Sequence, residues 1–260
     1  ALELHPRSDE ALFNIAEIYH LKGQWDEAVR YQVRDSERAF GAERLSIYLR
    51  DLGLQEEADR LLTRASAEVP VSFPGEESLS LHYMLLGDHE QARVHSARML
   101  TLLPGFTFSW QRAGDIELAA GDPQRAQEYV EKAVTLAGAS QPYPKLRLAY
   151  LLLLRGEKEN ARTLLDEAAA ATLQSINNGH EAWFYPWNMA VVESLLGNKK
   201  ASIEWYEKAV EAGRRRYEWD EWDPVFDGLR NEPRFQAALE KQRQLRWQMQ
   251  ERAAVMIRQL

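Results

Sequence analysis

The chain has 260 residues, of which 32 are basic and 40 acidic, for a formal net charge of −8, and 45 % are hydrophobic. This charge argues against general attraction to nucleic acid or anionic lipid, and the hydrophobic content argues against disorder. Cysteine is absent, which excludes disulfides, thiolate catalysis and cysteine-bound metal. No run approaches 18 apolar residues, so no membrane span is predicted, and the compartment stays open between cytoplasm and periplasm.

The first residues resemble the end of a repeating unit whose beginning is missing. Residues 1–6, Ala-Leu-Glu-Leu-His-Pro, match the last part of a repeat, and the first full unit starts only at about Asp9. We therefore expect the chain to be part of a longer protein, with a partial repeat at residues 1–8.

A short pattern recurs along the chain: a glycine, a small residue five positions later and often another after seven more. Its clearest copy has Gly121, Ala126 and Ala133. The six glycines of this frame are Gly23, Gly53, Gly87, Gly121, Gly156 and Gly197. They are separated by 30, 34, 34, 35 and 41 residues. A period near 34 predicts stacked helix pairs, each touching only its neighbours.

The predicted units follow one another at about residues 9–38, 39–72, 73–106, 107–140 and 142–175, and a sixth begins near residue 183. The short first step predicts a tight connection between the first two units. The long last step predicts an insert at about residues 173–181, where Asn177, Asn178 and Gly179 favour a turn. The residues after three frame glycines, Asp88, Asp122 and Asn198, are expected to cap the second helices.

The frame resembles the tetratricopeptide repeat (TPR). In the fourth unit, Trp110, Gly114, Gly121, Ala126 and Ala133 match the large, small, glycine and alanine positions of that repeat. The resemblance covers residues 1–212. It implies an all-α fold, a right-handed superhelix of about six helix pairs whose first helices line a concave groove. Residues 213–260 would form a separate C-terminal capping segment with a long helix.

The C-terminal part departs from the repeat. Residues 219–235 contain Pro224, Gly228 and Pro233 and predict short helices. They resemble the tail of TPR arrays in bacterial signalling proteins, including cyclase-linked and winged-helix transcription regulators. This resemblance implies that residues 226, 229 and 235 cover the last helix pair. Residues 234–260 predict one long helix with an apolar stripe, which either packs back on the array or protrudes and forms a homodimer.

The candidate partner site lies on the first helices. The TPR resemblance implies that certain first-helix positions face the groove, and at these positions polar residues alternate with aromatic ones. The polar set is Asn14, Arg44, Arg112, Arg147 and Asn188, and the aromatic set is Phe13, Phe108, Tyr143, Tyr150 and Trp187. Arginine forks bind carboxylates and aromatic rings anchor apolar groups, so a protein or peptide ligand, acidic or C-terminal, is expected. The alternative is that the arginines pair with Glu17, Glu43 or Asp115.

No catalytic constellation, cofactor motif or metal site is predicted. His82, His89 and His95 fall in one unit without ligand spacing. Residues 214–216 are three arginines followed by acidic residues, which predicts an internal salt-bridge cluster and no nucleic-acid site. The aromatic residues crowded into 183–222 are read either as core or as a pocket near the insert for a small molecule or a peptide side chain.

These observations favour a non-enzymatic scaffold that binds a partner in its groove and belongs to a larger bacterial signalling or regulatory protein. The alternative is a ligand-sensing domain that controls a linked transcription-regulator or cyclase domain.

Overall fold

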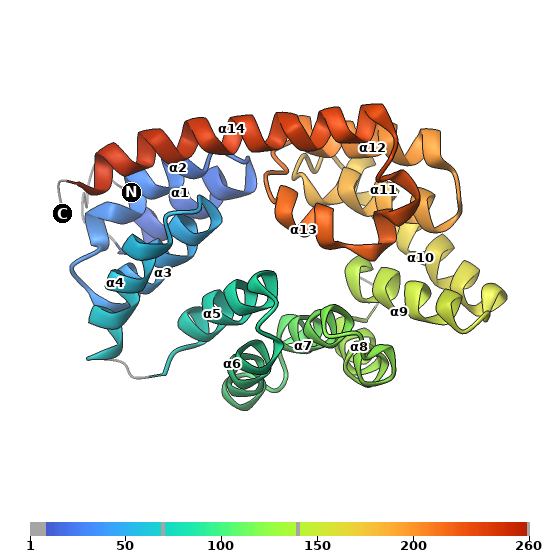
Figure 1. Cartoon of the computed structure of the whole chain (residues 1–260), viewed down its shortest axis with the longest axis horizontal. Helices are drawn as coiled ribbons and strands as arrows, with labels where there is room; N and C mark the ends of the chain where they lie inside the picture. The colour runs from blue at the N-terminus through green and yellow to red at the C-terminus, as the bar shows by residue number, and fades with distance from the viewer. Residues whose placement is uncertain (1–8, 69–70, 139–140, 259–260) are drawn as a thin grey trace.

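The computed structural model describes residues 9–68, 71–138 and 141–258, so the partial repeat expected at 1–8 lies outside it. Within these residues the fold is all-helical, as predicted, and six helix pairs follow one another along an arc (Figure 1). The first helices are α1 Asp9–Leu21, α3 Ala39–Asp51, α5 Phe73–Leu86, α7 Thr107–Ala119, α9 Pro142–Leu154 and α11 Phe184–Leu195. The second helices are α2 Trp25–Gln32, α4 Gln55–Ser66, α6 His89–Leu102, α8 Pro123–Ala137, α10 Lys158–Asn177 and α12 Lys199–Glu211.

The glycine–small-residue frame acts as predicted. All six frame glycines end or follow a first helix with φ between 67° and 82°, a conformation that costs other residues energy. The small residue five positions later is fully enclosed in every copy: Ala28, Ala58, Ala92, Ala126, Ala161 and Ser202. A small side chain there lets the two helices of a pair approach closely.

Two of the three predicted helix caps are confirmed. The Asp88 and Asp122 carboxylates accept hydrogen bonds from the backbone N–H groups of Gln91 (3.1 Å) and Arg125 (3.0 Å). The prediction for Asn198 is wrong, because its amide instead donates to Glu193 (2.8 Å).

The two irregular spacings have different structural outcomes. The short spacing between Gly23 and Gly53 results from a short second helix in the first pair. This helix, α2, has only eight residues and continues through the 3-10 turn η1 Val33–Asp35 directly toward α3. The insert predicted at 173–181 is present, and its first part is helical: α10 runs for 20 residues to Asn177, and the chain turns around Gly179 (φ 84°), as expected from Asn177, Asn178 and Gly179. Four consecutive alanines at 168–171 favour this extension, because alanine has the highest helix propensity.

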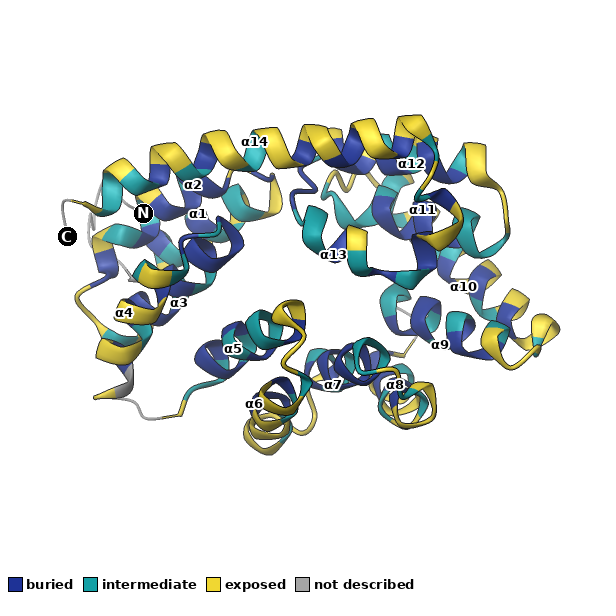
Figure 2. Cartoon of the chain, in the orientation of Figure 1, coloured by how far each residue is buried: buried dark blue, intermediate teal, exposed yellow. Residues whose placement is uncertain are grey.

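The long helix α14 Pro233–Ile257 packs back on the array and bridges its two ends (Figure 1). Its first turns pack on α12, where Phe235 and Leu239 join a large core formed by the C-terminal pairs. Its last turns pack on α2, where Met249 and Ala253 join a second core formed by the first two pairs. One side of α14 is therefore buried along its length and the other is exposed (Figure 2).

Close contacts join the two ends of the arc beneath α14. Gly23, after α1, lies against Gly213, after α12, with the two backbones in direct contact. The Arg216 guanidinium reaches Asp51 at the end of α3 (3.0 Å), and the same carboxylate contacts the His20 ring (2.8 Å). These contacts turn an open arc into a closed ring.

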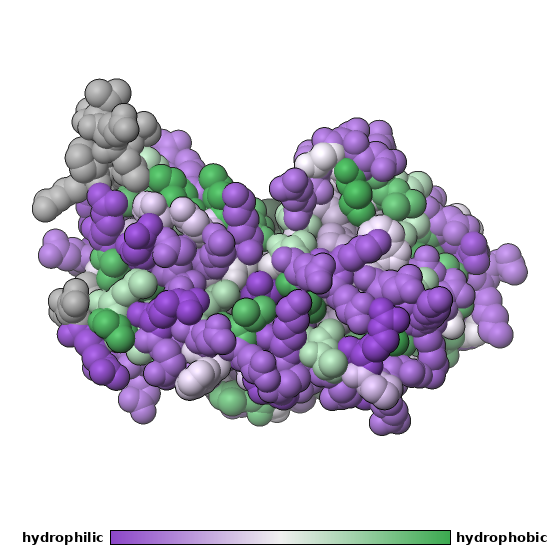
Figure 3. Space-filling model, turned by 90° about the horizontal axis from the view of Figure 1, so that it is seen from above, coloured by the Kyte–Doolittle hydropathy of each residue, from purple (hydrophilic) through white to green (hydrophobic). Residues whose placement is uncertain are grey.

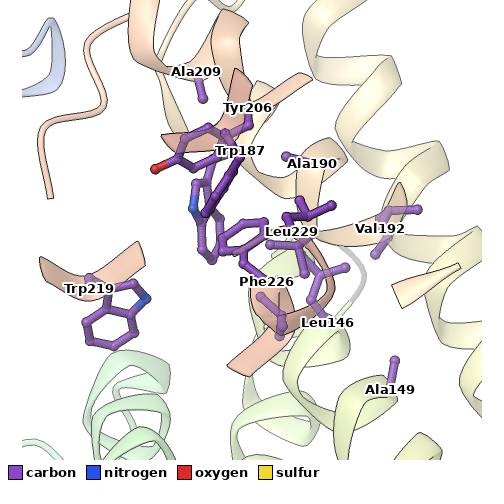
Figure 4. Close-up of a cluster of buried hydrophobic side chains, with 14 of the residues drawn as sticks. Leu146, Ala149, Trp187, Ala190, Val192, Tyr206, Ala209, Trp219, Phe226 and Leu229 are labelled. Carbon is purple, nitrogen blue, oxygen red and sulfur yellow. The ribbon is translucent and has the colours of Figure 1, made fainter. Parts of the chain in front are cut away.

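The segment between α12 and α14 caps the sixth pair from inside the ring. It contains the short helix α13 Tyr217–Trp222 and the 3-10 helix η2 Pro224–Leu229. Phe226, Leu229 and Phe235 are completely or almost completely buried, which confirms their predicted capping role. Phe226 packs its ring against Trp187 and Tyr206, whereas Trp219 lies apart from this group (Figure 4).

The outer surface beside α14 is mostly hydrophilic, with hydrophobic residues in separate patches (Figure 3). No helix in the described part of the chain is long and apolar enough to cross a membrane.

We predict that Gly213→Ala destabilises the protein by opening the ring. Gly213 has φ 120°, and a Cβ there would lie 2.5 Å from the carbonyl carbon of Lys22. Gly179→Ala is the matched control, since Gly179 also has a positive φ (84°) but no atom within 4 Å of an added Cβ. Backbone strain costs about 1–3 kcal/mol in either variant. Urea unfolding should show a clearly larger loss for Gly213→Ala, and equal losses would contradict the backbone contact.

Candidate binding site on the concave side

The predicted groove residues divide into three groups. Those that lie together around one cavity on the inner side of the ring are Phe108, Arg112, Tyr143, Trp187 and Asn188. Arg147 lies beside this cavity in a buried salt bridge, while Phe13 and Arg44 lie on the inner side of the N-terminal pairs. Asn14 is exposed, and Tyr150 is half-buried against the hydrophobic core.

The positive charge of Arg147 is balanced by carboxylates of the same chain. Its guanidinium donates two hydrogen bonds to the Asp223 carboxylate (2.7 and 2.6 Å) and one to the Tyr143 hydroxyl (2.8 Å), and it contacts Asp115 (3.0 Å). Burial acts to lower the pKa of Arg147, but Asp223, Tyr143 and Asp115 together hold it well above its ordinary value. The pairing with Asp115 is the alternative foreseen from the sequence, and Asp223 is an additional partner.

A second carboxylate of the C-terminal segment, Asp220, is fully buried and saturated with donors. It accepts hydrogen bonds from Arg214 (2.6 Å), from the Tyr206 hydroxyl (2.7 Å) and from the Trp187 indole (3.1 Å). Together with the Arg216–Asp51 contact, this confirms the predicted salt bridges for Arg214 and Arg216, whereas Arg215 donates to the backbone carbonyls of Val210 and Arg214. We call residues 219–223 the inner segment, because it lies on the concave side of the array and binds the first helices there.

Arg112 differs from its equivalent, Arg147. Only 3 % of Arg112 is exposed, yet it makes no hydrogen bond or ion pair with any described residue, and its Nε atom is enclosed without a partner. The guanidinium lies over the rings of Phe108 (5.2 Å) and Trp219 (5.5 Å). Burial lowers the pKa of Arg112, and the more distant Asp115 and Glu77 offset this only in part.

The cavity beside Arg112 has a volume of about 410 Å³ and lies between α7, α9, α11 and α13. Its charged lining residues are Arg112, Arg214, Arg216 and Asp115. Its aromatic lining residues are Phe108, Tyr143, Trp183, Phe184, Tyr185, Trp187 and Trp219. The aromatic pocket foreseen near the insert is therefore present, while other aromatic residues of 183–222, such as Tyr206, belong to the core as the alternative reading proposed.

A second hollow of about 220 Å³ lies on the concave side of the N-terminal pairs. It is lined in part by Arg44 and Phe106, and the Arg44 guanidinium lies over the rings of Phe13 (4.6 Å) and Phe40 (5.3 Å). Phe40 and Phe106 are 50 % and 47 % exposed. An arginine flanked by exposed aromatic rings can bind a carboxylate and an apolar side chain at the same time.

Of the three histidines of the third unit, His95 has a clear structural role. His95 stacks on Tyr83 and bonds to the Glu76 carboxylate (2.6 Å). Among the described residues, no group of three or more potential ligands is arranged to hold a metal ion.

Comparison with known proteins supports the repeat assignment. Two family models, both described as tetratricopeptide repeat, match residues 1–30 and residues 109–140 and 187–212. A search of curated protein sequences finds no match.

Solved structures show the same fold at low sequence identity. A chain of the APC/C hetero-tetramer Cut9–Hcn1 matches 97 % of this chain over 50 % of its own length, with a TM-score of 0.63 and 15 % identity. PilF of Pseudomonas aeruginosa matches 82 % of this chain and 96 % of its own, with a TM-score of 0.53 and 18 % identity. The predicted TPR superhelix is confirmed.

We predict opposite effects for two equally buried arginines. Arg147→Met leaves the Asp223 and Asp115 carboxylates buried without their cation, which costs about 3–5 kcal/mol of unfolding free energy. Arg112→Met removes a buried charge that has no ion-pair partner, so we expect no loss of stability or a gain. Urea unfolding of both variants measures the difference, and a comparable loss for Arg112→Met would show that the Arg112 charge is stabilised within the fold.

Proposed function

We propose that the chain is a non-enzymatic interaction module whose concave side binds an extended protein or peptide segment containing acidic and aromatic residues. The observation that carries this proposal is the inner segment. Its carboxylates are held by Arg147 and Arg214, and its Trp219 ring lies against the Arg112 and Arg147 guanidinium groups. The concave side thus already binds a segment of this chemistry within the same chain.

The part of the concave side left open by the inner segment has the same chemical character. Arg44 makes no ion pair with a described residue, and its guanidinium lies over the adjacent rings of Phe13 and Phe40. A partner carboxylate would be bound by Arg44, and a partner aromatic side chain would pack on Phe40 or Phe106. The proposed groove extends from there to the cavity lined by Phe108, Arg112, Tyr143, Trp187 and Asn188. Asn14 and Tyr150 would lie at its margins.

The proposal includes a larger bacterial signalling or regulatory protein as the context of this module. It rests on the similarity of residues 219–235 to the tails of TPR-bearing regulators. The structurally similar Cut9–Hcn1 complex is a hetero-tetramer, which illustrates assembly with a protein partner on a similar fold. The second candidate function, a ligand-sensing domain that controls a linked regulator or cyclase, is favoured by the aromatic cavity beside Arg112.

Homodimerisation through α14 stays a prediction. Its residues Phe235, Met249 and Ala253 are buried against the same chain, so a dimer contact would have to use the exposed side with Trp247 and Val255.

The groove proposal is tested with a fluorescent peptide that has the sequence of residues 217–223. Wild-type protein should bind it, and Arg44→Ala should weaken binding about tenfold, because a charge-assisted hydrogen bond contributes about 1.5–3 kcal/mol. The control is Arg162→Ala on the outer face of α10, where Arg162 is exposed and pairs with Asp166. The same peptide with Asn and Gln in place of Asp and Glu should bind weakly. Equal binding by Arg44→Ala and wild type, or no binding by wild type, would contradict the groove.

A further inference from the structure

We infer that the cavity between α7, α9, α11 and α13 binds an aromatic carboxylate, with the carboxylate on Arg112 and the ring among the surrounding aromatic side chains. This inference does not depend on peptide binding near Arg44. It deepens the second candidate function, since it assigns a chemical class of ligand to the cavity.

The first argument is that the Arg112 guanidinium has no ion-pair or hydrogen-bond partner among the described residues. The arginines around it each have a carboxylate partner: Arg147 has Asp223, Arg214 has Asp220 and Arg216 has Asp51. Arg112 makes no hydrogen bond or ion pair with a described residue, although it is 97 % buried and lines the cavity, and its guanidinium lies over the rings of Phe108 and Trp219. A buried cation without a directly bonded partner is costly, and an anion entering the cavity would accept hydrogen bonds from it.

The charge balance around the cavity favours an anion with a single negative charge. Asp115 also lines the cavity, contacts Arg147 (3.0 Å) and accepts hydrogen bonds from the Tyr143 hydroxyl (3.0 and 2.9 Å). Because Arg147 is shared by Asp115 and Asp223, the four arginines Arg112, Arg147, Arg214 and Arg216 are matched in number by four carboxylates. The lining thus has free donors on Arg112 but no surplus of positive charge, which suits a singly charged carboxylate better than a doubly charged phosphate.

Asn188 provides a second polar group. Only 4 % of it is exposed, it lines the same cavity, and its side chain has no hydrogen-bond partner among the described residues. An amide N–H donor in addition to a guanidinium would orient a carboxylate or bind a polar substituent of the ring.

The aromatic side chains that line the rest of the cavity indicate that the apolar part of the ligand is a planar ring. Phe108, Tyr143, Trp183, Trp187 and Trp219 all line the cavity, and Tyr143 and Trp187 stack with a centroid distance of 5.8 Å. Flat aromatic walls favour a planar ring between them. The volume of about 410 Å³ lies in the lower part of the range of small-molecule sites, about 300–1,000 Å³. A ligand of one or two fused rings fits this size.

Two sources carry this chemistry, a free aromatic acid and the C-terminal aromatic residue of a peptide. Titration calorimetry should therefore use four probes: indole-3-acetate, phenylacetate, 2-naphthoate and the peptide acetyl-Gly-Gly-Trp with a free C-terminus. Tighter binding of a free acid would identify a metabolite site, and tighter binding of the peptide a C-terminus site. Both results support the inference, provided that the matching uncharged amide binds at least tenfold more weakly.

Two variants test whether the carboxylate of the ligand binds at Arg112 and Asn188. Arg112→Gln should weaken binding at least tenfold, and Asn188→Asp, which adds a negative charge to the cavity, should do the same. Arg162→Gln, far from the cavity on the exposed face of α10, should bind like wild type. Circular dichroism and thermal unfolding establish that each variant is folded. The inference is overturned if none of the four probes binds wild type, if the amides bind as tightly as the acids, or if folded Arg112→Gln binds like wild type.

Discussion

The docking of Asp220 and Asp223 on buried arginines is the constraint from which the rest of the architecture follows. Asp223 bonds to Arg147 of the fifth helix pair through two hydrogen bonds, and Asp220 bonds to Arg214 at the end of the sixth. Both carboxylates are completely buried, so either one without its cation would be strongly destabilising. These two pairs therefore hold the inner segment on the concave side of the array, where open TPR arrays present a groove.

The position of the inner segment determines where α14 begins and what it can cover. Because the inner segment and η2 cap the sixth pair from inside, α14 starts beside α12 and extends along the array to α2. Its buried face then contributes to both hydrophobic cores, and Gly23 meets Gly213 beneath it. The inner segment also lines the cavity of about 410 Å³ on the concave side of the C-terminal pairs, through Trp219, and leaves the Phe13–Phe40–Arg44 region open.

The sequence predicted the parts of this structure that depend on local interactions. The frame from Gly121 to Ala126 specifies the end of one helix and its close approach to the next within six residues, so each pair could be placed from its own segment. The same holds for the cap at Asp122. The prediction for Asn198 was wrong because its amide donates to the Glu193 side chain instead. The insert and its turn were placed correctly, but the extension of an alanine-rich helix through the first part of the insert was not predicted.

The long-range pairings could not be predicted in this way. Arg112 and Arg147 occupy equivalent positions in their repeats, yet only Arg147 receives a carboxylate, from Asp223, 76 residues away. The repeat pattern cannot predict that pairing, because the pairing depends on where residues 213–260 pack on the array. The two Trp–Asp pairs in residues 219–223 were the available signal, since carboxylates buried beside tryptophans need cationic partners and the inner face offered arginines.

The closed ring is tested most directly by the distance between its two ends in solution. The chain has no cysteine, so spin labels can be attached at Arg30→Cys on α2 and Glu204→Cys on α12, both exposed positions. Pulsed electron paramagnetic resonance should give one narrow distribution of distances between the two spin labels in the full chain. It should become longer and broader when the chain is truncated after Gln242, because the truncated chain lacks the part of α14 that contacts α2. A broad distribution in the full chain, or an unchanged narrow one after truncation, would contradict closure of the array by its C-terminal segment.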